Sequence, residues 1–292
     1  MYVTNFNPFF YNWIITQNLF FQNPLKIMNK KPWGFKKQKN INEKLTRFGF
    51  KGKDLVHDEI VALYLSKNKL GQAILENKEL ENLDLSHAKL NGIYFYKSKI
   101  NSIEFHGTDF SGSFFSKIYI NNSNFEYGKL RGTVFDNSEI VQTNFHGTDF
   151  SGSSIKNCKI TDSFFTRSDF HGTDFFGSVL DNVDLSNSVL NGSKLNGLDL
   201  RKVIFKNTSL KGVSFLQADL SETQLQELDF YGSLMMDANL MGADLSNSDL
   251  SGVDFEDANL SGANLSRANL SGANLSGANL SGANLEGAIG VV

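Results

Sequence analysis

Three side chains that can bind protons or metals recur at a spacing of twenty residues in the middle of the chain. The segment FHGTDFSGS occurs at 105–113 and again at 145–153. His106 and His146 occupy the same position in the two copies, and Glu126 lies midway between them. Two imidazoles and a carboxylate in one outward row are able to hold a metal ion or to act as a pH-sensitive patch. The alternative is an exposed row of side chains that pair with one another and do no chemistry.

Other signatures of catalysis are missing from the sequence. It contains no GxSxG, no GxxxxGK[ST], no HExxH and no CxxC. The single cysteine, Cys158, rules out a disulfide framework and a cysteine-rich zinc site. We therefore expect a protein without enzymatic activity and without a cofactor.

A five-residue period organises most of the chain. Every fifth residue from Leu85 to Leu285, at all 41 positions, is Leu, Phe, Ile or Met. With this residue numbered i, position i−2 is small or apolar, and glycine recurs at i+2. A period of five fits neither an α-helix nor a simple strand, but it suits a chain that turns a corner every five residues. Positions i−2 and i then fill the interior, which leaves no pore and no ligand cavity.

A second period predicts four units in each coil. Ile100, Ile120, Ile140 and Ile160 are spaced by twenty residues, and a series of phenylalanines has the same spacing. Like residues should therefore stack on successive coils, about 4.8 Å apart. The 41 units correspond to about ten coils.

The pattern resembles the pentapeptide-repeat family, whose motif is A(D/N)Lxx. Ala243-Asp244-Leu245, Ala238-Asn239-Leu240 and the run 258–285 carry the resemblance, which covers about residues 81–289. It implies an all-β solenoid, a right-handed quadrilateral β-helix. We expect this β-helix to span residues 81–292.

The residues before the repeat predict a helical cap and a separate head. Fifth-residue apolarity continues backward, but Lys78 occupies an i−2 position where an unpaired charge is costly to bury. We therefore expect a mostly helical N-terminal cap over 54–80, with Asp54 as its N-cap. Residues 1–53 form a basic, aromatic-rich head. Its aromatic face and the lysines that follow predict a flexible or targeting segment able to lie on an anionic membrane surface. The candidate membrane-contact residues are Phe9, Phe10, Trp13, Ile14, Phe20 and Phe21.

The leading functional hypothesis is a protein-binding scaffold. On the five-residue grid, several aromatic side chains point outward, and aromatic residues are enriched at interface hot spots. The candidate protein-contact residues are Tyr94, Tyr96, Phe114, Tyr119, Phe164 and Phe176. The net charge of −3 makes direct nucleic-acid binding unexpected.

Two alternatives remain open. Some members of the family resemble duplex DNA and bind DNA gyrase, and the segment 217–292, with 11 acidic residues against Arg267 alone, invites a DNA-mimic hypothesis. The layout is also similar to secreted bacterial effectors with a non-repeat head, which would place the protein at a membrane or outside the cell. The scaffold hypothesis predicts a cytoplasmic protein.

The last coil predicts self-association. An open coil exposes unpaired backbone groups that invite end-to-end pairing. We expect a homodimer through this end, with Ala283, Ile289 and Val291 at the contact.

Overall fold

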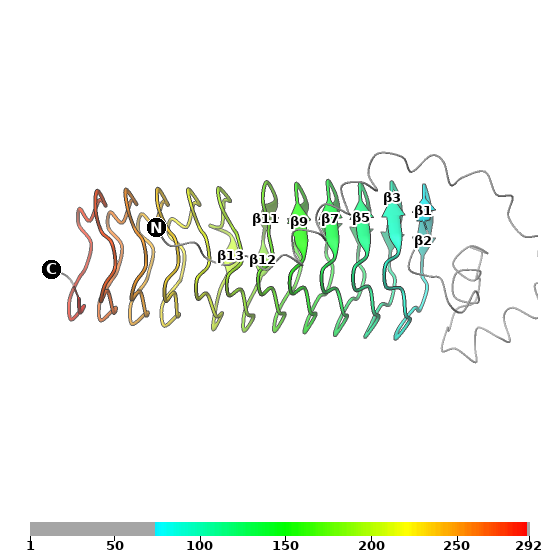
Figure 1. The fold of residues 1–292 in the computed structure, drawn as a ribbon, viewed down its shortest axis with the longest axis horizontal. Coiled ribbons are helices and arrows are strands. Elements are labelled where there is room, and N and C mark those ends of the chain that lie inside the picture. The colour runs from blue at the N-terminus through cyan, green and yellow to red at the C-terminus, as the bar shows by residue number, and fades with distance from the viewer. Residues whose placement is uncertain (1–73, 291–292) are drawn as a thin grey trace, which may run out of the picture. The chain divides into compact units, whose positions relative to one another are not determined.

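The computed structural model describes residues 74–290, and they form an all-β solenoid of parallel coils. Each residue pairs with the one twenty positions later, from Ile74 with Tyr94 to Asn269 with Ile289. Because the repeat has five residues, each coil has four sides. Figure 1 shows the coils following one another in sequence order from β1 to the C-terminal end.

The four sides are named here after the central residue of their first unit. Face 1 contains the units centred on Leu75 and on every twentieth residue after it, and faces 2, 3 and 4 start likewise at Leu80, Leu85 and Leu90. Regular strands occur mainly on the first two faces. They are β1 (Ile74–Glu76), β2 (Glu79–Glu81), β3 (Tyr94–Tyr96), β4 (Lys99–Asn101), β5 (Phe114–Ser116), β6 (Tyr119–Asn121), β7 (Val134–Asp136), β8 (Glu139–Val141), β9 (Ser154–Lys156), β10 (Lys159–Thr161), β11 (Val179–Asp181), β12 (Val183–Asp184) and β13 (Val203–Ile204).

The sheet order follows directly from the coiling. On face 1 the order is β1-β3-β5-β7-β9, and on face 2 it is β2-β4-β6-β8-β10-β11. The strands of face 1 lie side by side in Figure 1. A short third sheet pairs β12 with β13 on face 3, and isolated parallel bridges continue the register elsewhere.

The interior contains two side chains from each unit, as the repeat predicts. Up to Leu270, nearly all residues at i and i−2 are buried, whereas most of their neighbours are exposed or half-buried. Like residues stack as the twenty-residue period predicts: Ile120 pairs with Ile100 and Ile140, and the rings of Phe145 and Phe165 lie 4.6 Å apart. This spacing is close to the ring distance that aromatic pairs prefer.

Buried serine and threonine at i−2 are bonded to the backbone of the neighbouring coil. Thr108 Oγ1 donates to the carbonyl of Leu85 over 2.8 Å, and Ser168 Oγ donates to that of Phe145 over 2.7 Å. The hydroxyls also accept from the coil before, as Ser123 Oγ does from the Ile103 N–H. Among the described residues, Ser193 Oγ is the one buried side-chain polar atom without a partner.

The corners have left-handed backbone geometry. Position i+2 has a positive φ in every unit from Asn77 to Gly287 except at Lys202. Many of these residues are not glycine, and their φ values lie near that of Asn137, at 48°. L-residues other than Asn and Asp adopt this left-handed region at a cost in free energy. The hydrogen-bonded ladders between successive coils must therefore hold these turns in place.

The solenoid begins earlier than the sequence predicts. Strands β1 and β2 occupy residues 74–81, so the last part of the expected helical cap at 54–80 is strand, and residues 74–290 contain no helix. Leu75 and Leu80 are buried beneath Phe95 and Ile100, while Lys78, the residue that argued against a coil, is only half-buried. Burial of Leu75 and Leu80, the residues at position i, is sufficient for residues 74–81 to join the stack. The remainder of the expected cap, residues 54–73, lies outside the described residues.

Candidate functional site: surfaces for protein interaction

The row predicted around Glu126 lies on face 3, but its members do not converge on one point. His106 Nδ1 lies 3.4 Å from Glu126 Oε2. His146 instead places Nδ1 2.6 Å from the hydroxyl of Thr166 on the next coil. The carboxylate therefore pairs with one of the two histidines.

Aromatic rings separate the two histidines. The ring of Tyr127 lies edge-on between them, 5.6 Å from His106 and 5.5 Å from His146. His87 extends the row at the other end, 5.3 Å from His106. Within residues 74–290 no three His, Cys, Asp or Glu side chains gather as metal ligands. The arrangement is a row of side chains along one corner that meet through edge-on ring contacts and one ion pair.

Three of the six aromatic contact candidates form a cluster on face 1. Tyr94 and Tyr96 stack at 5.9 Å on β3, and Phe114 of β5 meets Tyr94 edge-on at 6.2 Å. All three are half-buried by their neighbours. Partial burial raises the pKa of Tyr94, although the hydrogen bond with Ser116 opposes that shift. The phenol of Tyr94 therefore stays a hydrogen-bond donor at neutral pH.

Two lysines complete this cluster. The ammonium of Lys97 lies 5.0 Å from the centre of the Tyr96 ring, and that of Lys117 lies 5.9 Å from it. Neither lysine has a carboxylate within ion-pair distance among residues 74–290, so both charges face solvent. The aromatic–lysine cluster, defined as Tyr94, Tyr96, Lys97, Phe114 and Lys117, thus combines apolar area with two unpaired cations. The lysines could have been found from the sequence, because each follows an aromatic strand of the grid by one corner.

A shallow groove runs beside the cluster, along the corner between faces 1 and 2. Its volume is about 490 Å³. Four lysines and a single carboxylate, that of Glu139, line it. Lys99 and Lys159 are partly neutralised by Glu79 and Glu139 at 2.7 and 3.3 Å. The groove is suited to an anionic segment of a partner. Its lining is Lys97, Ser98, Lys99, Lys117, Ile118, Tyr119, Asn137, Ser138, Glu139, Asn157 and Lys159.

The other three aromatic candidates do not gather in one place. Tyr119 stands on face 2 within the groove, and Phe164 is isolated on face 3. Phe176 lies on face 1, four coils after the first aromatic strand of the cluster, and 63% of its surface is exposed. It is the most exposed of the large hydrophobic side chains that the structure describes.

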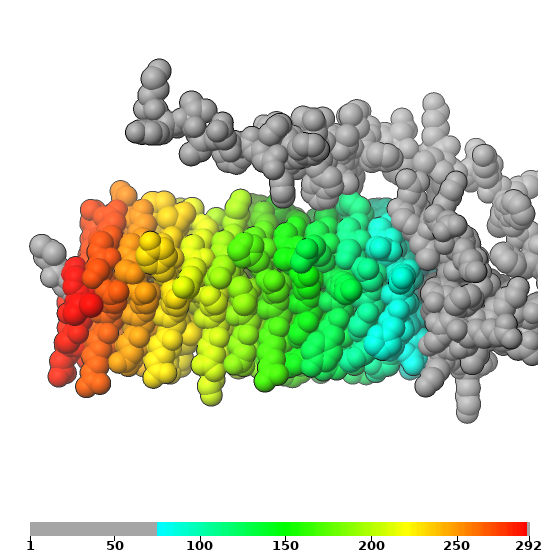
Figure 2. All heavy atoms as spheres, turned by 60° about the horizontal axis from the view of Figure 1, so that its bottom comes forward, coloured from blue at the N-terminus to red at the C-terminus, as the bar shows by residue number. Residues whose placement is uncertain are grey.

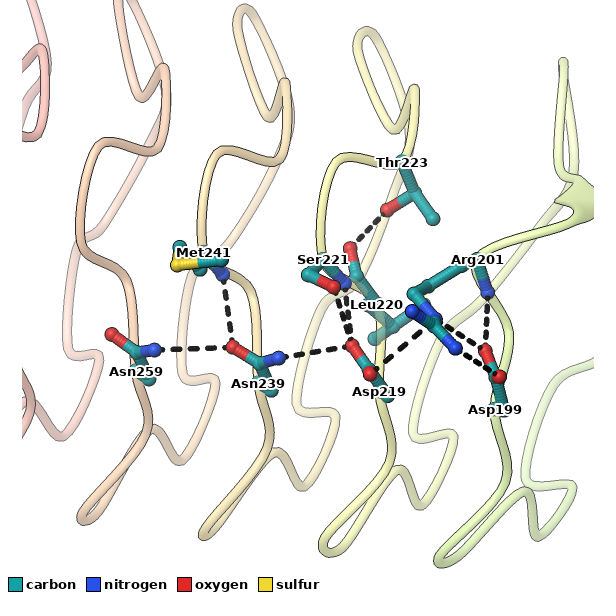
Figure 3. Close-up of polar contacts among 9 residues, drawn as sticks. All are labelled: Asp199, Arg201, Asp219, Leu220, Ser221, Thr223, Asn239, Met241 and Asn259. Atoms are coloured by element: carbon teal, nitrogen blue, oxygen red, sulfur yellow. Dashed lines mark hydrogen bonds and ion pairs between the residues drawn. The ribbon is translucent and has the colours of Figure 1, made fainter.

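The outward rows of Asp and Asn are part of the turn chemistry. Figure 3 shows one such row on face 2. Asn259 donates to Asn239 over 3.1 Å, and Asn239 donates to Asp219 over 3.0 Å. Each of these acceptor oxygens also accepts the N–H two residues later in its own unit, as Asp219 does from Ser221 at 3.0 Å. At the end of the row the guanidinium of Arg201 donates two hydrogen bonds to Asp199, at 2.9 and 2.6 Å, and its backbone N–H donates a third at 3.2 Å.

These bonds give the Asp or Asn of the motif a structural role. An Asx side chain that accepts from the second residue after it fixes the start of a turn, and its amide links neighbouring coils. The same pattern recurs at Asp149, Asp249 and Asp254. The aspartates at position i−1 of the C-terminal coils therefore stabilise corners.

Cys158 lies in the interior at an i−2 position, as the grid predicts. Burial raises the pKa of its thiol to about 12. Because the thiolate is the reactive form, this cysteine is inert at neutral pH.

The remaining predicted sites are only partly described. Phe9, Phe10, Trp13, Ile14, Phe20 and Phe21 lie outside the described residues, as does Val291. Ala283 is half-buried in the last coil and Ile289 is 58% exposed. Within 74–290 the structure contains no apolar helix long enough to cross a membrane.

Comparison with known families identifies the repeat. The model described as "Pentapeptide repeats" matches at 79–116, 205–237, 218–257, 238–277 and 254–289, in eight copies. A second model, "Pentapeptide repeat region", matches at 98–175 and 138–215. Together the two models cover the chain continuously from residue 79 to residue 289. No curated protein sequence matches the chain.

Solved structures of repeat proteins are similar to the chain. HetL, involved in heterocyst differentiation regulation in the cyanobacterium Nostoc sp. strain PCC 7120, is 25% identical, with 80% of this chain and 95% of HetL covered and a TM-score of 0.44. A variant of QnrB1, a plasmid-mediated fluoroquinolone resistance protein, is 19% identical, covers 73% and 92%, and has a TM-score of 0.31. Rfr23 from the cyanobacterium Cyanothece 51142 is 22% identical, covers 47% and 90%, and has a TM-score of 0.24. These scores carry no argument about function.

Proposed function

Because the chain belongs to the pentapeptide repeat family, we propose that it is a non-enzymatic scaffold that binds another protein through its outer faces or ends. In this proposal the solenoid is a right-handed, four-sided rod of about ten coils. The observation that carries the proposal is the aromatic–lysine cluster on face 1. Tyrosine is enriched at interface hot spots, and unpaired cations beside it can steer an acidic partner to the surface.

The interior supports a scaffold rather than an enzyme. The described core is filled by stacked side chains, and its hydroxyls bond to the backbone. The one thiol has a pKa of about 12 and cannot act as a nucleophile at neutral pH. Chemistry would have to occur on an outer face, where the described titratable side chains mostly pair with each other or cap turns.

Affinity capture tests the scaffold proposal. Full-length protein, a form with residues 41–292, and a full-length Tyr96→Ser, Phe114→Ser variant would be used as baits in extract from the native host. We expect a partner to bind the first two and to be lost with the variant. A Phe164→Ser variant, which removes a similar ring from face 3, is the matched control and should keep the partner. If the partner binds all four baits equally, face 1 is not its binding surface.

The acidic C-terminal third favours a second candidate, a DNA mimic acting on gyrase. Its support is limited, because several of these carboxylates cap turns, as those of Asp249 and Asp254 do. A gyrase supercoiling assay with the purified protein tests this candidate. Protection or inhibition at stoichiometric protein would favour the mimic over the scaffold.

A membrane-associated or translocated protein, targeted by its head, is a further proposal about residues that the structure does not describe. Its test is membrane association of the full chain compared with a form lacking residues 1–40. Retention of the shorter form at the membrane would contradict targeting by the head. A cytoplasmic location remains the expectation for the scaffold.

We also propose a homodimer through the C-terminal coil. The inward side chains Ala283 and Leu285 of that coil are half-buried, whereas the equivalent residues of earlier coils are buried. Ala283→Lys with Ile289→Lys should then produce monomers in light scattering. An unchanged mass would contradict this end-to-end contact.

A further inference from the structure

The charges of face 1 change sign along the stack. Lys97 and Lys117 occupy the corner between faces 1 and 2 near the N-terminal end of the stack, and Asp237 and Asp257 occupy the same corner near the other end. Glu256 lies next to Asp257 on face 1. All five side chains are exposed, and none has an ion-pair partner among the described residues. A face with unpaired cations at one end and unpaired anions at the other is complementary to an inverted copy of itself.

The apolar side chains of face 1 follow the same symmetry. Phe114 and Leu234 occupy equivalent outward positions, three coils on either side of the coil that contains Phe175. Phe176, with 63% of its surface exposed, lies in that central coil. Leu216 and Met236 add half-buried apolar area in the C-terminal half of the face.

The twenty-residue register makes the symmetry quantitative. The coils centred on Phe95 and Phe255 lie 80 residues before and after Phe175, which is four coils in each direction. A two-fold axis in the plane of contact, perpendicular to the stack at Phe175, superposes the two ends. This operation keeps the corner between faces 1 and 2 against the same corner of the other copy. It therefore places Lys97 opposite Asp257 and Lys117 opposite Asp237.

We propose that face 1 is the interface of an antiparallel homodimer, in which two chains pack face to face about an axis at Phe176. This inference rests on the proposed function, since it names a second copy as the protein that binds the aromatic–lysine cluster. In this dimer Phe114 packs on Leu234, Phe176 packs on its own copy, and Tyr94 and Tyr96 lie opposite Asp254 and Glu256. Closed two-fold symmetry makes every contact occur twice. The contact runs for eight coil steps, about 40 Å at the strand spacing.

The opposite edge of face 1 allows the close approach that such a dimer needs. Every corner residue between faces 4 and 1, at each twentieth position from Gly92 to Gly272, is glycine. A Cβ added at Gly172 or Gly232 would meet no atom within 4 Å, so packing inside the chain does not select glycine there. Other corners with the same positive φ carry Lys, Asn or Glu. Because the two-fold axis brings this edge against itself, the missing side chains let the two backbones come together.

The carboxylates near the axis are compatible with the arrangement. Asp174 would meet its own copy, but its charge is balanced by Lys156 at 2.7 Å in the same chain. Asp136 is the exception, because it would face Leu216 rather than a cation. By the two-fold symmetry the contact thus has two unfavourable pairs against four charge pairs and a central aromatic contact.

A long polyanion is a poorer occupant of the cluster. At the corner between faces 1 and 2 the unpaired lysines are restricted to two successive coils, and Asn137 and Asn157 follow them there. The next unpaired lysine of face 1, Lys194, stands alone four coils after Lys117, and from Asp237 onward the face is acidic, so an extended nucleic acid would lie over like charge there. In a second copy Asp237 and Asp257 lie one coil apart at the same corner, so the two acids match the spacing of Lys97 and Lys117.

Charge reversal tests the pairing with the full-length chain in sedimentation equilibrium. The unaltered protein should show twice its mass of 32.5 kDa at micromolar concentration. A Lys97→Glu, Lys117→Glu variant and an Asp237→Lys, Asp257→Lys variant should each dimerise at least a hundredfold more weakly, because like charges then face one another. An equimolar mixture of the two variants should recover the dimer, since every reversed pair becomes attractive again. The corner geometry accepts both residue types, because Glu222 and Lys97 already adopt it.

Matched controls separate the interface from general charge effects. A Lys89→Glu, Lys206→Glu variant makes the same change of charge on faces 4 and 3 and should remain dimeric. An Ala283→Lys, Ile289→Lys variant distinguishes this interface from the C-terminal one, because it should remain dimeric if face 1 is the contact and become monomeric if the C-terminal coil is. If that variant is monomeric and the face 1 variants are not, the dimer is end-to-end and the face 1 inference is wrong.

Crosslinking tests the position of the axis independently. A Phe176→Cys variant treated with a short bis-maleimide should yield a covalent dimer, whereas Phe164→Cys on face 3 should not. Cys158 is buried with a raised pKa and does not interfere. A protein that is still a monomer at about 100 µM would overturn the homodimer. If the captured partner is nevertheless lost with Tyr96→Ser, Phe114→Ser, the scaffold proposal survives and its partner is a different protein.

Discussion

The two halves of the stack fill the same interior with different side chains. Between Phe95 and Phe175 the central residue is mostly Phe or Ile and position i−2 is mostly Ser or Thr. Between Ala238 and Leu285 the central residue is mostly Leu and position i−2 is mostly Ala. The backbone is the same in both, with a twenty-residue register and left-handed corners. The interior therefore requires one large and one small side chain in each unit, and it does not require a particular pair.

The two fillings stabilise the stack by different means. Stacked phenylalanines, such as Phe115 and Phe135 at 4.5 Å, combine apolar burial with ring contacts. Most of the buried serine and threonine hydroxyls, such as those of Ser113 and Ser168, add a bond to the backbone of the neighbouring coil. The alanine and leucine half has a single buried hydroxyl of this kind, that of Ser248, and its side chains bury less area. Its outward Asn ladders provide additional links between coils instead.

The largest expected effect is the loss of a ring from the phenylalanine ladder. Phe145 is fully buried, with Phe125 and Phe165 at 4.9 and 4.6 Å. Phe145→Ala should lower the free energy of unfolding by about 4 kcal/mol, because both the transfer energy and a cavity are involved. Leu260→Ala in the other half should cost about 3 kcal/mol by the same mechanism. Urea denaturation measures both, and a larger loss for Leu260→Ala would reverse the comparison.

The buried hydroxyls should contribute differently to the free energy of unfolding, according to their hydrogen-bond partners. Ser168 Oγ donates to the Phe145 carbonyl and accepts the Thr148 N–H, so Ser168→Ala should cost about 1 kcal/mol. Ser193 Oγ is buried without a partner, so Ser193→Ala should leave stability unchanged or raise it by up to about 1 kcal/mol. The matched pair is read from the same urea curves. A similar loss of stability at Ser168 and Ser193 would mean that the volume of the small side chain, and not its hydrogen bond, determines its contribution.

Most of the fold could be predicted because the repeat is local and periodic. Leu, Phe, Ile or Met at every fifth position marked the buried residues, and identical residues at twenty, such as Ile100 and Ile120, gave the register. The predicted start of the solenoid is wrong, because the prediction requires Lys78 to be fully buried in a coil. In the first described coil the i−2 residues Leu83 and Ala88 are buried, but Lys78 is only half-buried and does not meet the full desolvation cost of a buried charge.

The candidate sites were predicted less well, because they depend on side-chain rotamers and on neighbours outside the motif. The grid placed His106 and Glu126 one coil apart, and they lie within ion-pair distance. It did not reveal that Tyr127 stands between the histidines or that His146 turns to Thr166. The grid also placed the aromatic candidates outside, but the importance of Lys97 and Lys117 appears only when their distances to Tyr96 are known.

Transfer of a hydroxyl into the second half gives a smaller effect. Ala258 is fully buried at i−2, and the carbonyl of Met235 on the preceding coil accepts the Ala238 N–H. The carbonyl of Phe145 accepts in the same way and also receives a serine hydroxyl. Ala258→Ser should therefore change the free energy of unfolding by no more than about 0.5 kcal/mol, because a new hydrogen bond offsets the burial of the hydroxyl. A loss of about 2 kcal/mol would show that the second half cannot supply the bond, and that the two interiors differ in backbone spacing.

The smallest expected effect is a dependence on pH that both halves share. Asp149 and Asp249 occupy the same position on face 4, five coils apart, and each accepts the N–H and the hydroxyl of the serine two residues later. The bonds from Ser251 lower the pKa of Asp249 against a slight opposing effect of burial. For Asp149 partial burial alone would raise the pKa, but the bonds from Ser151 and the charge of Arg131 lower it overall. Since both pKa values lie below their ordinary value, the ionised carboxylates stabilise the fold above about pH 4, and this contribution is lost as pH falls through the folded pKa.

Thermal unfolding midpoints should be constant between about pH 7 and 5 and should fall below about pH 4. In Asp249→Asn the amide oxygen still caps the turn, as Asn259 does, so this variant should unfold at a slightly lower temperature than the parent at neutral pH and at the same temperature at low pH. Parallel pH profiles for the variant and the parent would show that these caps act through geometry alone, in the same way as the Asn caps of the second half.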